Sequence, residues 1–489
     1  MNRFFKVYSK YIILAALAYM PLFGHLDNLP IRAWDEARLA INAYEMHRNG
    51  NMIVTYFDGQ PEDWNTKPPL MIWLQVFFMK IIGVNELAIR LPSALAALGT
   101  CLTLLLFSIQ YLKKFWFGFI AVMFLITSQA YIHIHSTRTG DYDALLTLFT
   151  TLSGIYFFLF YETKRPKQLY LFFVFTTLAV LTKSITGLLF IPALVVYSIL
   201  RNQFIPLLKN RHFYYGLLSF CVVVFGYYLL REFYQPGYIS LVQQNELGGR
   251  YLNVLENHEH PFWYYYSKFI GSNLFPWPLL LPCGLILGLV IRNVRMRRLT
   301  LFASIMILTF FLIISFSKTK LEWYDVPLFP FLSLLAAVFV NYIFEFFKNL
   351  KRANQTLTNN ILPFIFLFLV FITPYQKIIN KTYLPKEQAH DKDAYEIGYY
   401  LKEALRKKHD LNGAYLLYDG YYAQNQFYVH ILNDRGVRID FKDYDKLEDG
   451  DVVIASQSNI KQYIEANYSS EVIKTNGNIV TYKIHGKKQ

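Results

Sequence analysis

The sequence predicts an all-α polytopic membrane protein with about 11 transmembrane helices, followed by a small C-terminal α/β soluble domain. Hydrophobic residues make up 54% of the 489-residue chain and charged residues only 17%, where a soluble domain has about 25%. Apolar runs recur along most of the chain, and many approach the ~20 residues that a helix needs to cross a bilayer core. The mean hydropathy is +0.25.

The net charge of +14 does not indicate a nucleic-acid partner. The basic residues stand in short clusters between the apolar runs, which is the pattern of cytoplasmic loops. We therefore expect no nucleic-acid partner, and we expect membrane lipids around the apolar runs.

The spans follow in order from the N-terminus. Residues 1–20 resemble a signal peptide but have no small-residue cleavage site, so a retained first span is expected at 11–26. Segment 70–83 is short and contains Lys80, which favours a helix at the membrane interface. The other ten spans are expected at 90–112, 115–131, 144–161, 169–181, 185–200, 213–230, 262–291, 299–316, 326–347 and 361–374.

Charge asymmetry fixes the orientation. With eleven crossings the inner loops hold most lysine and arginine clusters, as the positive-inside rule requires. Counting 70–83 as a crossing would place the basic run 292–298 outside. The N-terminus is thus predicted inside. Residues 1–375 form the membrane domain, with a first outer loop at 29–89, and residues 376–489 form a domain outside.

The tail alternates helices and strands, which predicts a small α/β unit. Helices are expected at 394–408, 423–432 and 460–466. Strands are expected at 414–418, 451–455, near 472 and at 479–484.

Acidic and basic side chains collect on the predicted outer face, several of them at the membrane boundary, where ionisable groups are costly and tend to be functional. Such a set suits a reaction that needs a general base and an anion clamp. Its members are Asp35, Glu36, Arg38, Lys67, Arg138, Asp141, Asp143, Lys183, Glu246, Arg250, His258, Lys318, Lys320 and Tyr324.

Asp35 precedes a helix with Ala37, Ala40, Ile41 and Tyr44 on one face, a pattern that predicts a helix lying on the membrane. Asp35 is either the N-cap of this helix or a general base. The second acidic pair, Asp141 and Asp143, favours the base.

The lysines allow two interpretations each. Lys67 precedes two prolines that hold it extended, so it is a phosphate contact or a snorkelling side chain. Lys183 interrupts an apolar run, so it lies in a loop between two spans or is a buried functional lysine. Lys320 lies in an outer loop, where it is a functional group or an interface anchor. Arg250 and His258 are site residues or ordinary loop residues. With His260, His258 could also bind a metal.

These residues, in this order, resemble the polyprenyl-phosphate-dependent glycosyltransferases of the GT-C class. The likeness is greatest to the protein O-mannosyltransferases and the lipid A aminoarabinose transferases. The motifs that carry it are Asp35-Glu36, Thr66 to Leu70, Arg90 to Ala94, Arg138 with Asp143, Leu181 to Ser184, Phe275 to Trp277, and Lys320 to Tyr324.

The chain departs from the family pattern at three motif positions. Thr66 replaces a glutamate, Ser184 a glycine and Glu322 a proline. Asp141 and Asp143 compete for the second family aspartate, and the Ala-Leu-Leu that follows favours Asp143.

The resemblance implies a membrane enzyme of the bacterial inner membrane that moves a sugar from a polyprenyl-phosphate donor to an acceptor hydroxyl, with inversion. Asp35 would be the general base, with Asp143 and Glu36 in the catalytic group. Tyr324, Asp141 and His258 would lie at the acceptor or in the groove. The residues expected to bind the lipid phosphate are Lys67, Lys183, Arg250, Lys320 and Arg138.

The resemblance also implies that no cofactor or metal is needed, with a divalent cation as the alternative. The acceptor stays open among a glycolipid, a polysaccharide and a protein. A lipid-linked polysaccharide polymerase or ligase, or a transporter, is the alternative function.

Overall fold

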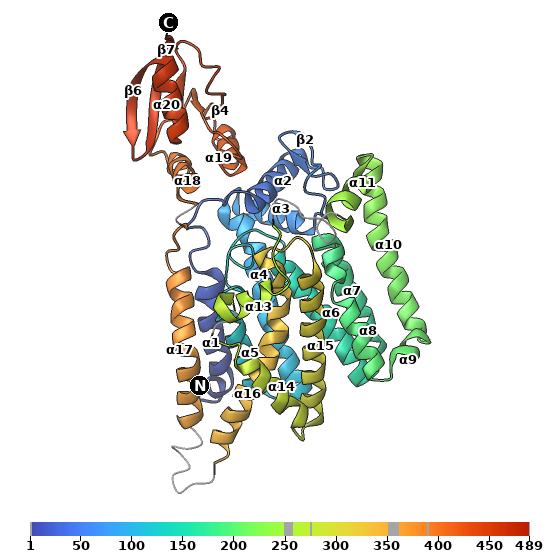
Figure 1. Ribbon diagram of the computed structural model, residues 1–489. Coiled ribbons are helices and arrows are strands. Elements are labelled where there is room, and N and C mark those ends of the chain that lie inside the picture. The colour runs from blue at the N-terminus through green and yellow to red at the C-terminus, as the bar shows by residue number, and fades with distance from the viewer. Residues whose placement is uncertain (1, 249–257, 274–275, 351–360, 389–390, 489) are drawn as a thin grey trace.

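The computed structural model describes residues 2–248, 258–273, 276–350, 361–388 and 391–488. It is a bundle of helices capped at one end by two short helices and the C-terminal domain (Figure 1). We call this the capped end. Seven helical segments of the described residues are long and apolar enough to cross a membrane. They contain α4 (Glu86–Phe107), α6 (Asp143–Thr163), α7 (Pro166–Lys183), α10 (Arg211–Tyr234), α15 (Val294–Phe316), α16 (Phe329–Lys348) and α17 (Leu362–Thr382).

The other four predicted spans coincide with shorter apolar helices, so the chain is a multi-pass membrane protein of the predicted class. These helices are α1 (Asn2–Phe23), α5 (Phe115–Ile126), α8 (Ile191–Leu200) and α14 (Leu280–Val290). The predicted span 262–291 is not one helix. It contains α13 (Tyr264–Lys268), the π-helical η4 (Phe269–Asn273) and α14. Pro276 and Pro278 lie between η4 and α14, and each removes a backbone donor that a continuous helix would need.

The end of the last apolar helix differs from the sequence-based expectation, and a predicted break within the bundle is present. α17 continues through Pro374 and ends at Thr382, so the last apolar helix is longer than predicted. The break at Lys183 is confirmed, because α7 ends there and Ser184 adopts a positive φ of 50°. The chain then forms the 3-10 helix η2 (Ser184–Leu188) before α8.

Short helices make the remaining turns of the bundle. They are η1 (Ser108–Leu112), α9 (Phe204–Leu208), α11 (Tyr238–Val242), η3 (Gln243–Gly248) and η5 (Glu322–Leu328).

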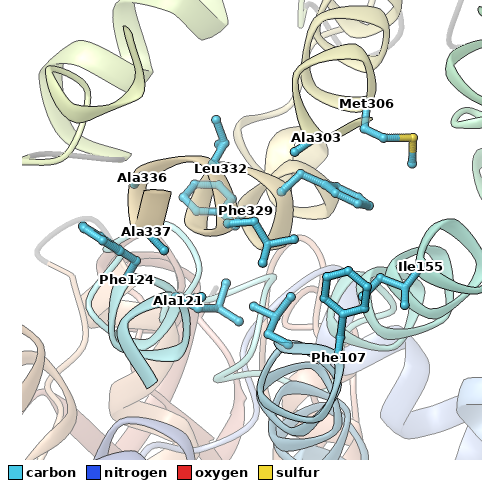
Figure 2. Packing of buried hydrophobic residues seen from close by; sticks show 14 of the residues in the cluster. Phe107, Ala121, Phe124, Ile155, Ala303, Met306, Phe329, Leu332, Ala336 and Ala337 are labelled. Atoms are coloured by element: carbon cyan, nitrogen blue, oxygen red, sulfur yellow. The ribbon is translucent and has the colours of Figure 1, made fainter. Parts of the chain in front are cut away.

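The core of the bundle lies around α16. Aromatic side chains such as Phe107, Phe124 and Phe329 fill the space between helices, and alanines let the backbones approach (Figure 2). Gly284 on α14 marks one such approach, since a Cβ there would lie 2.1 Å from the carbonyl oxygen of Leu335 on α16. This packing fixes the helix ends that carry the site.

The capped end is built from α2 (Asp35–Asn49), α3 (Leu70–Ile82) and the hairpin of β1 (Tyr56–Phe57) and β2 (Gln60–Pro61). The predicted helix after Asp35 is present, but its apolar face packs against protein. Ala37, Ala40 and Ile41 are fully buried, and α2 contacts α3 and the C-terminal domain. The expectation that this face lies on the membrane was therefore wrong, because α3 and the C-terminal domain cover it.

The C-terminal domain is a five-stranded mixed sheet in the order β4-β3-β5-β7-β6. The predicted helices and strands are present, and β4 is an additional edge strand that pairs in parallel with β3. The elements are α18 (Lys392–Leu405), β3 (Ala414–Leu416), α19 (Ala423–Asp434), β4 (Ile439–Phe441), β5 (Val452–Ala455), α20 (Ser458–Asn467), β6 (Tyr468–Asn476) and β7 (Ile479–Lys487).

This domain holds the turn that leads into α2. The Tyr428 hydroxyl donates to Glu86 and accepts from the backbone of Ile31. Lys402 pairs with Glu86 at 2.9 Å. The Tyr421 ring stacks on the Trp34 indole with centroids 4.5 Å apart. The C-terminal domain thus contacts the residue directly before Asp35.

Candidate active site

The candidate site lies at the capped end, where four segments from distant parts of the chain meet. They are the start of α2, the start of α3, the loop between α5 and α6 (residues 127–142), and the end of α7. Asp35 of α2 lies beside His135 of the loop, whereas Lys67 and Lys183 pair with Glu246 and Asp143.

Asp35 is the first residue of α2, and the N-cap position is occupied by Trp34. Its carboxylate is 54% exposed, and its Oδ2 lies 3.6 Å from Nδ1 of His135. Asp35 is therefore not the N-cap of α2. A half-exposed carboxylate that is held on one side by an imidazole can accept a proton from a bound hydroxyl.

Asp141 lies beside the same imidazole, 3.5 Å from Nδ1 of His135, and is buried. The Thr139 hydroxyl donates to its carboxylate. Burial alone would raise the pKa of the Asp141 carboxyl, but His135 and Thr139 hold that pKa below its ordinary value. Asp141, rather than Asp143, is the second aspartate next to Asp35.

Asp143 instead pairs with Lys183, whose Nζ donates to both carboxylate oxygens at 2.6 and 2.8 Å. The Lys183 ammonium also lies over the ring of Tyr324, 5.5 Å from its centroid. Three predicted site residues are thus brought together at the junction of α6, α7 and η5.

These residues line a cavity of about 100 Å³ that also receives Lys67. Lys67 pairs at 3.2 Å with Glu246, a member of the predicted outer-face set that had no individual role. The Thr66 hydroxyl donates to the same carboxylate at 3.4 Å. Glu246 thus supplies a carboxylate beside Lys67, at the place where the family motif carries a glutamate and this chain carries Thr66. The rest of the cavity wall is largely apolar, from Leu146, Ile185, Leu189, Ile313, Ile314 and Pro327.

Glu36 does not face this cavity. Its buried carboxylate accepts two hydrogen bonds from Arg90, at 2.7 and 2.8 Å, and one each from the backbones of Arg32 and Gly140. Gly140 approaches α4 closely, since a Cβ there would lie 2.4 Å from Ile89. Glu36 ties α2, α4 and the 127–142 loop together.

The remaining predicted residues lie elsewhere around the site. Arg138 donates to the carbonyls of Pro21 and Gly24, at the end of α1. Lys320 donates to the carbonyl of Ser317 at 2.5 Å, and its backbone donates to the carbonyl of His258. Arg250 lies outside the described residues.

A second, more polar cavity of about 450 Å³ lies on the other side of His135. Arg32, His133 and Lys381 line it together with Trp323. An adjoining cavity adds Arg138, Arg90 and Lys386. Burial and Lys381 lower the pKa of His133 to about 3, so its imidazole is neutral. Burial and Arg90 lower the pKa of Arg138 to about 10, so its guanidinium stays charged at neutral pH.

Among the described residues, the ligand atoms of Asp35, His135 and Asp141 lie within 4.8 Å of one another and could approach a metal ion. Arg32, however, hydrogen-bonds to Nε2 of His135. Because arginine only donates, Nε2 accepts and Nδ1 carries the hydrogen. A protonated Nδ1 is not a metal ligand, so this donor set does not fit a cation through Nδ1. Metal independence remains a prediction.

Sequence analysis gave no role to Arg32 and His135, and it included Trp323 only within the Lys320 to Tyr324 motif. His135 and His133 stand two residues apart in one loop, and no pattern in the sequence distinguishes the one that faces Asp35.

Comparison with known proteins adds to this geometry. Residues 66–228 match the family model described as dolichyl-phosphate-mannose-protein mannosyltransferase. An uncharacterized protein of Aquifex aeolicus (strain VF5) is 25% identical over 370 residues, which cover 74% of this chain and 68% of the relative.

The structure resembles the crystal structure of ArnT from Cupriavidus metallidurans bound to undecaprenyl phosphate. The TM-score is 0.69 with 16% sequence identity, over 97% of each chain. This chain has the GT-C fold. The undecaprenyl phosphate-alpha-4-amino-4-deoxy-L-arabinose arabinosyl transferase of Wigglesworthia glossinidia brevipalpis is 26% identical over 333 residues, 65% of this chain and 55% of the relative. The resemblance to GT-C glycosyltransferases that the motifs predicted is confirmed.

Proposed function

We propose that this GT-C protein transfers a sugar from a polyprenyl phosphate to an acceptor hydroxyl at the outer face of a bacterial inner membrane. The observation that carries the proposal is the position of the half-exposed Asp35 carboxylate. It lies at His135, with the lysine-lined cavity and the basic cavity close by. One cavity suits a lipid phosphate, and the other suits an acceptor.

The donor cavity combines charge with an apolar wall. Lys67 and Lys183 line one part of it, and their ion pairs with Glu246 and Asp143 fix both ammonium groups at the cavity. Aliphatic side chains of the η2 region and α15 line the rest. A phosphate on a polyprenyl chain matches this division, and a solved structure with the same fold is described as bound to undecaprenyl phosphate.

The reaction then needs one proton acceptor and one stabilised leaving group. Asp35 takes the proton of the acceptor hydroxyl as its oxygen bonds to the anomeric carbon. The bond from that carbon to the phosphate oxygen breaks on the opposite face, so the configuration inverts. The lipid phosphate leaves with both electrons of this bond, and Lys67 and Lys183 stabilise its added negative charge.

The acceptor cavity is basic, which favours an acceptor that carries anionic groups near its hydroxyl. Cations outnumber carboxylates in it and in the adjoining cavity. The cations are Arg32, Arg90, Arg138, Lys381 and Lys386, and the carboxylates are Glu322, Glu387 and Asp391. A glycolipid, a polysaccharide and a protein can each carry such anionic groups. A lipid-linked polysaccharide polymerase or ligase would differ from the proposed enzyme only in its acceptor. We place the capped end outside, because the basic loops lie at the other end of the bundle and basic loops stay on the cytoplasmic side.

The donor site can be tested without knowing the sugar. Undecaprenyl phosphate should raise the unfolding temperature of the purified protein in detergent, because a ligand that binds only the folded state stabilises it. The variant Lys67→Met should bind this probe about 10–100-fold more weakly, since a hydrogen bond to a charged group contributes about 1.5–3 kcal/mol.

Lys80→Met is the matched control, because Lys80 is an exposed lysine of the neighbouring helix α3. It should bind undecaprenyl phosphate as the wild type does. If undecaprenyl phosphate leaves the wild-type unfolding temperature unchanged, or if both variants bind equally, the proposed donor site is wrong.

A further inference from the structure

His135 is the residue at the centre of the site to which the proposed mechanism gives no task. Its side chain is 9% exposed, and its ring stacks on the Trp323 indole with centroids 3.8 Å apart. Its backbone φ is +59°, a left-handed conformation that residues with a Cβ rarely adopt. Its backbone N–H donates to Thr139 at 2.7 Å. Such strained positions persist where the surrounding structure holds them, often at functional sites.

The two ring nitrogens of His135 have different partners. Nε2 accepts from the Arg32 guanidinium, which fixes the hydrogen on Nδ1. That N–H faces two carboxylates, Asp35 at 3.6 Å and Asp141 at 3.5 Å. Both distances exceed those of a strong hydrogen bond, so one N–H is placed between two acceptors. Contacts of this kind often tighten when substrate binds.

We propose that His135 is a positioning residue, whose Nδ1–H aims the Asp35 carboxylate at the acceptor hydroxyl. The inference rests on the proposed function. Arg32 sets the tautomer of His135, and Trp323 sets the plane of its ring. The Nδ1–H holds Oδ2 of Asp35 and leaves the other oxygen for the acceptor proton. When that proton arrives, His135 keeps its own hydrogen and donates it to Asp141.

Other titratable groups near Asp35 do not replace this donor. Tyr142 and Tyr421 both interact electrostatically with Asp35. The Tyr142 hydroxyl hydrogen-bonds to Asn65, and the Tyr421 hydroxyl donates to the carbonyl of Trp34. Asp141 is an acceptor, and Arg32 is bound to His135. Of the described lysine, arginine and histidine side chains, His135 is the one within 4.0 Å of the Asp35 carboxylate.

Two substitutions separate the hydrogen bond from the packing of the ring. His135→Leu keeps an apolar side chain against Trp323 but removes the donor. His135→Asn keeps an N–H near the place of Nδ1. His47→Asn, in the later part of α2, is the control for a histidine of the same region. The assay is release of undecaprenyl phosphate from undecaprenyl-phosphate-linked aminoarabinose or mannose, in the presence of extracted membrane glycolipids.

His135→Leu is expected to lower kcat about 10–100-fold, with KM for the lipid donor unchanged, because the base loses the donor that aims it. Binding of undecaprenyl phosphate should not change. His135→Asn should keep kcat within about fivefold of the wild type, because it retains the donor.

Three results would overturn the inference. One is a His135→Leu variant that folds and keeps the wild-type kcat. Another is a His135→Asn variant as impaired as His135→Leu. The third is loss of wild-type activity on adding a chelator, which would make His135 a metal ligand. If the wild type neither binds undecaprenyl phosphate nor turns over either donor, the proposed function itself fails, and this inference fails with it.

Discussion

Replacing Asp35 with asparagine is expected to lower kcat by a factor of about 10²–10⁴, the usual contribution of a general base. The amide has nearly the shape of the carboxylate but cannot take the acceptor proton. The donor cavity lies around Lys67 and Lys183 and does not include Asp35. Undecaprenyl phosphate should therefore bind the variant as tightly as it binds the wild type. The measurement is initial-rate sugar transfer together with the shift in unfolding temperature.

Asp27→Asn is the matched control, because Asp27 is an exposed aspartate only a few residues before Asp35 in the same segment. It should transfer sugar at the wild-type rate. An Asp35→Asn variant with wild-type kcat would show that another group takes the proton. A loss of donor binding in that variant would show instead that Asp35 acts on the lipid phosphate.

Hydropathy and charge asymmetry were enough to predict the bundle, because each span must satisfy its backbone hydrogen bonds within a helix. Hydropathy and charge asymmetry could not predict which surface covers the apolar face of a helix, because tertiary packing decides that. The apolar face of α2 is the same pattern whether a membrane or a protein surface covers it, and here α3 and the C-terminal domain cover it. Prolines broke the predicted span 262–291, yet Pro374 did not end α17.

Part of the site could also be predicted from the sequence. Motif order led to Lys67, Lys183 and Tyr324, and the structure brings all three to one cavity. The sequence favoured Asp143 as the second family aspartate, but it could not show which of Asp141 and Asp143 lies beside Asp35, because two residues of difference change the direction of a side chain at a helix start. Asp141 precedes α6 and turns toward His135, whereas Asp143 begins α6 and meets Lys183.

Glu36 shows how an adjacent pair of acids can divide between chemistry and architecture. Both residues follow the same strained backbone at Trp34, whose φ is +71°. The next two side chains then point in different directions. The Asp35 carboxylate is half exposed at His135, and the Glu36 carboxylate is buried on Arg90. A motif match identifies the pair but not this division.

The Arg90–Glu36 pair leads to the second large prediction, which concerns stability. Arg90 is buried, and besides Glu36 it donates to the carbonyls of Leu26, Leu29 and Pro30, each at 2.7 Å. The variant Arg90→Met removes all these donors and leaves the Glu36 carboxylate buried without its counter-ion. Breaking a buried pair in this way costs about 3–5 kcal/mol. Unfolding in mixed detergent micelles should report a loss of that size in the free energy of unfolding.

Arg48→Met provides the contrast. Arg48 pairs with Asp434 at 3.2 Å, but its side chain is 62% exposed, and exposed pairs contribute about 0–1 kcal/mol. The double variant Arg90→Met/Glu36→Gln should recover part of the loss, since no buried charge is left alone. If Arg90→Met is no less stable than Arg48→Met, the pair does not hold the turn before Asp35. The geometry of the general base would then have to come from the C-terminal domain, through Tyr428 and Tyr421.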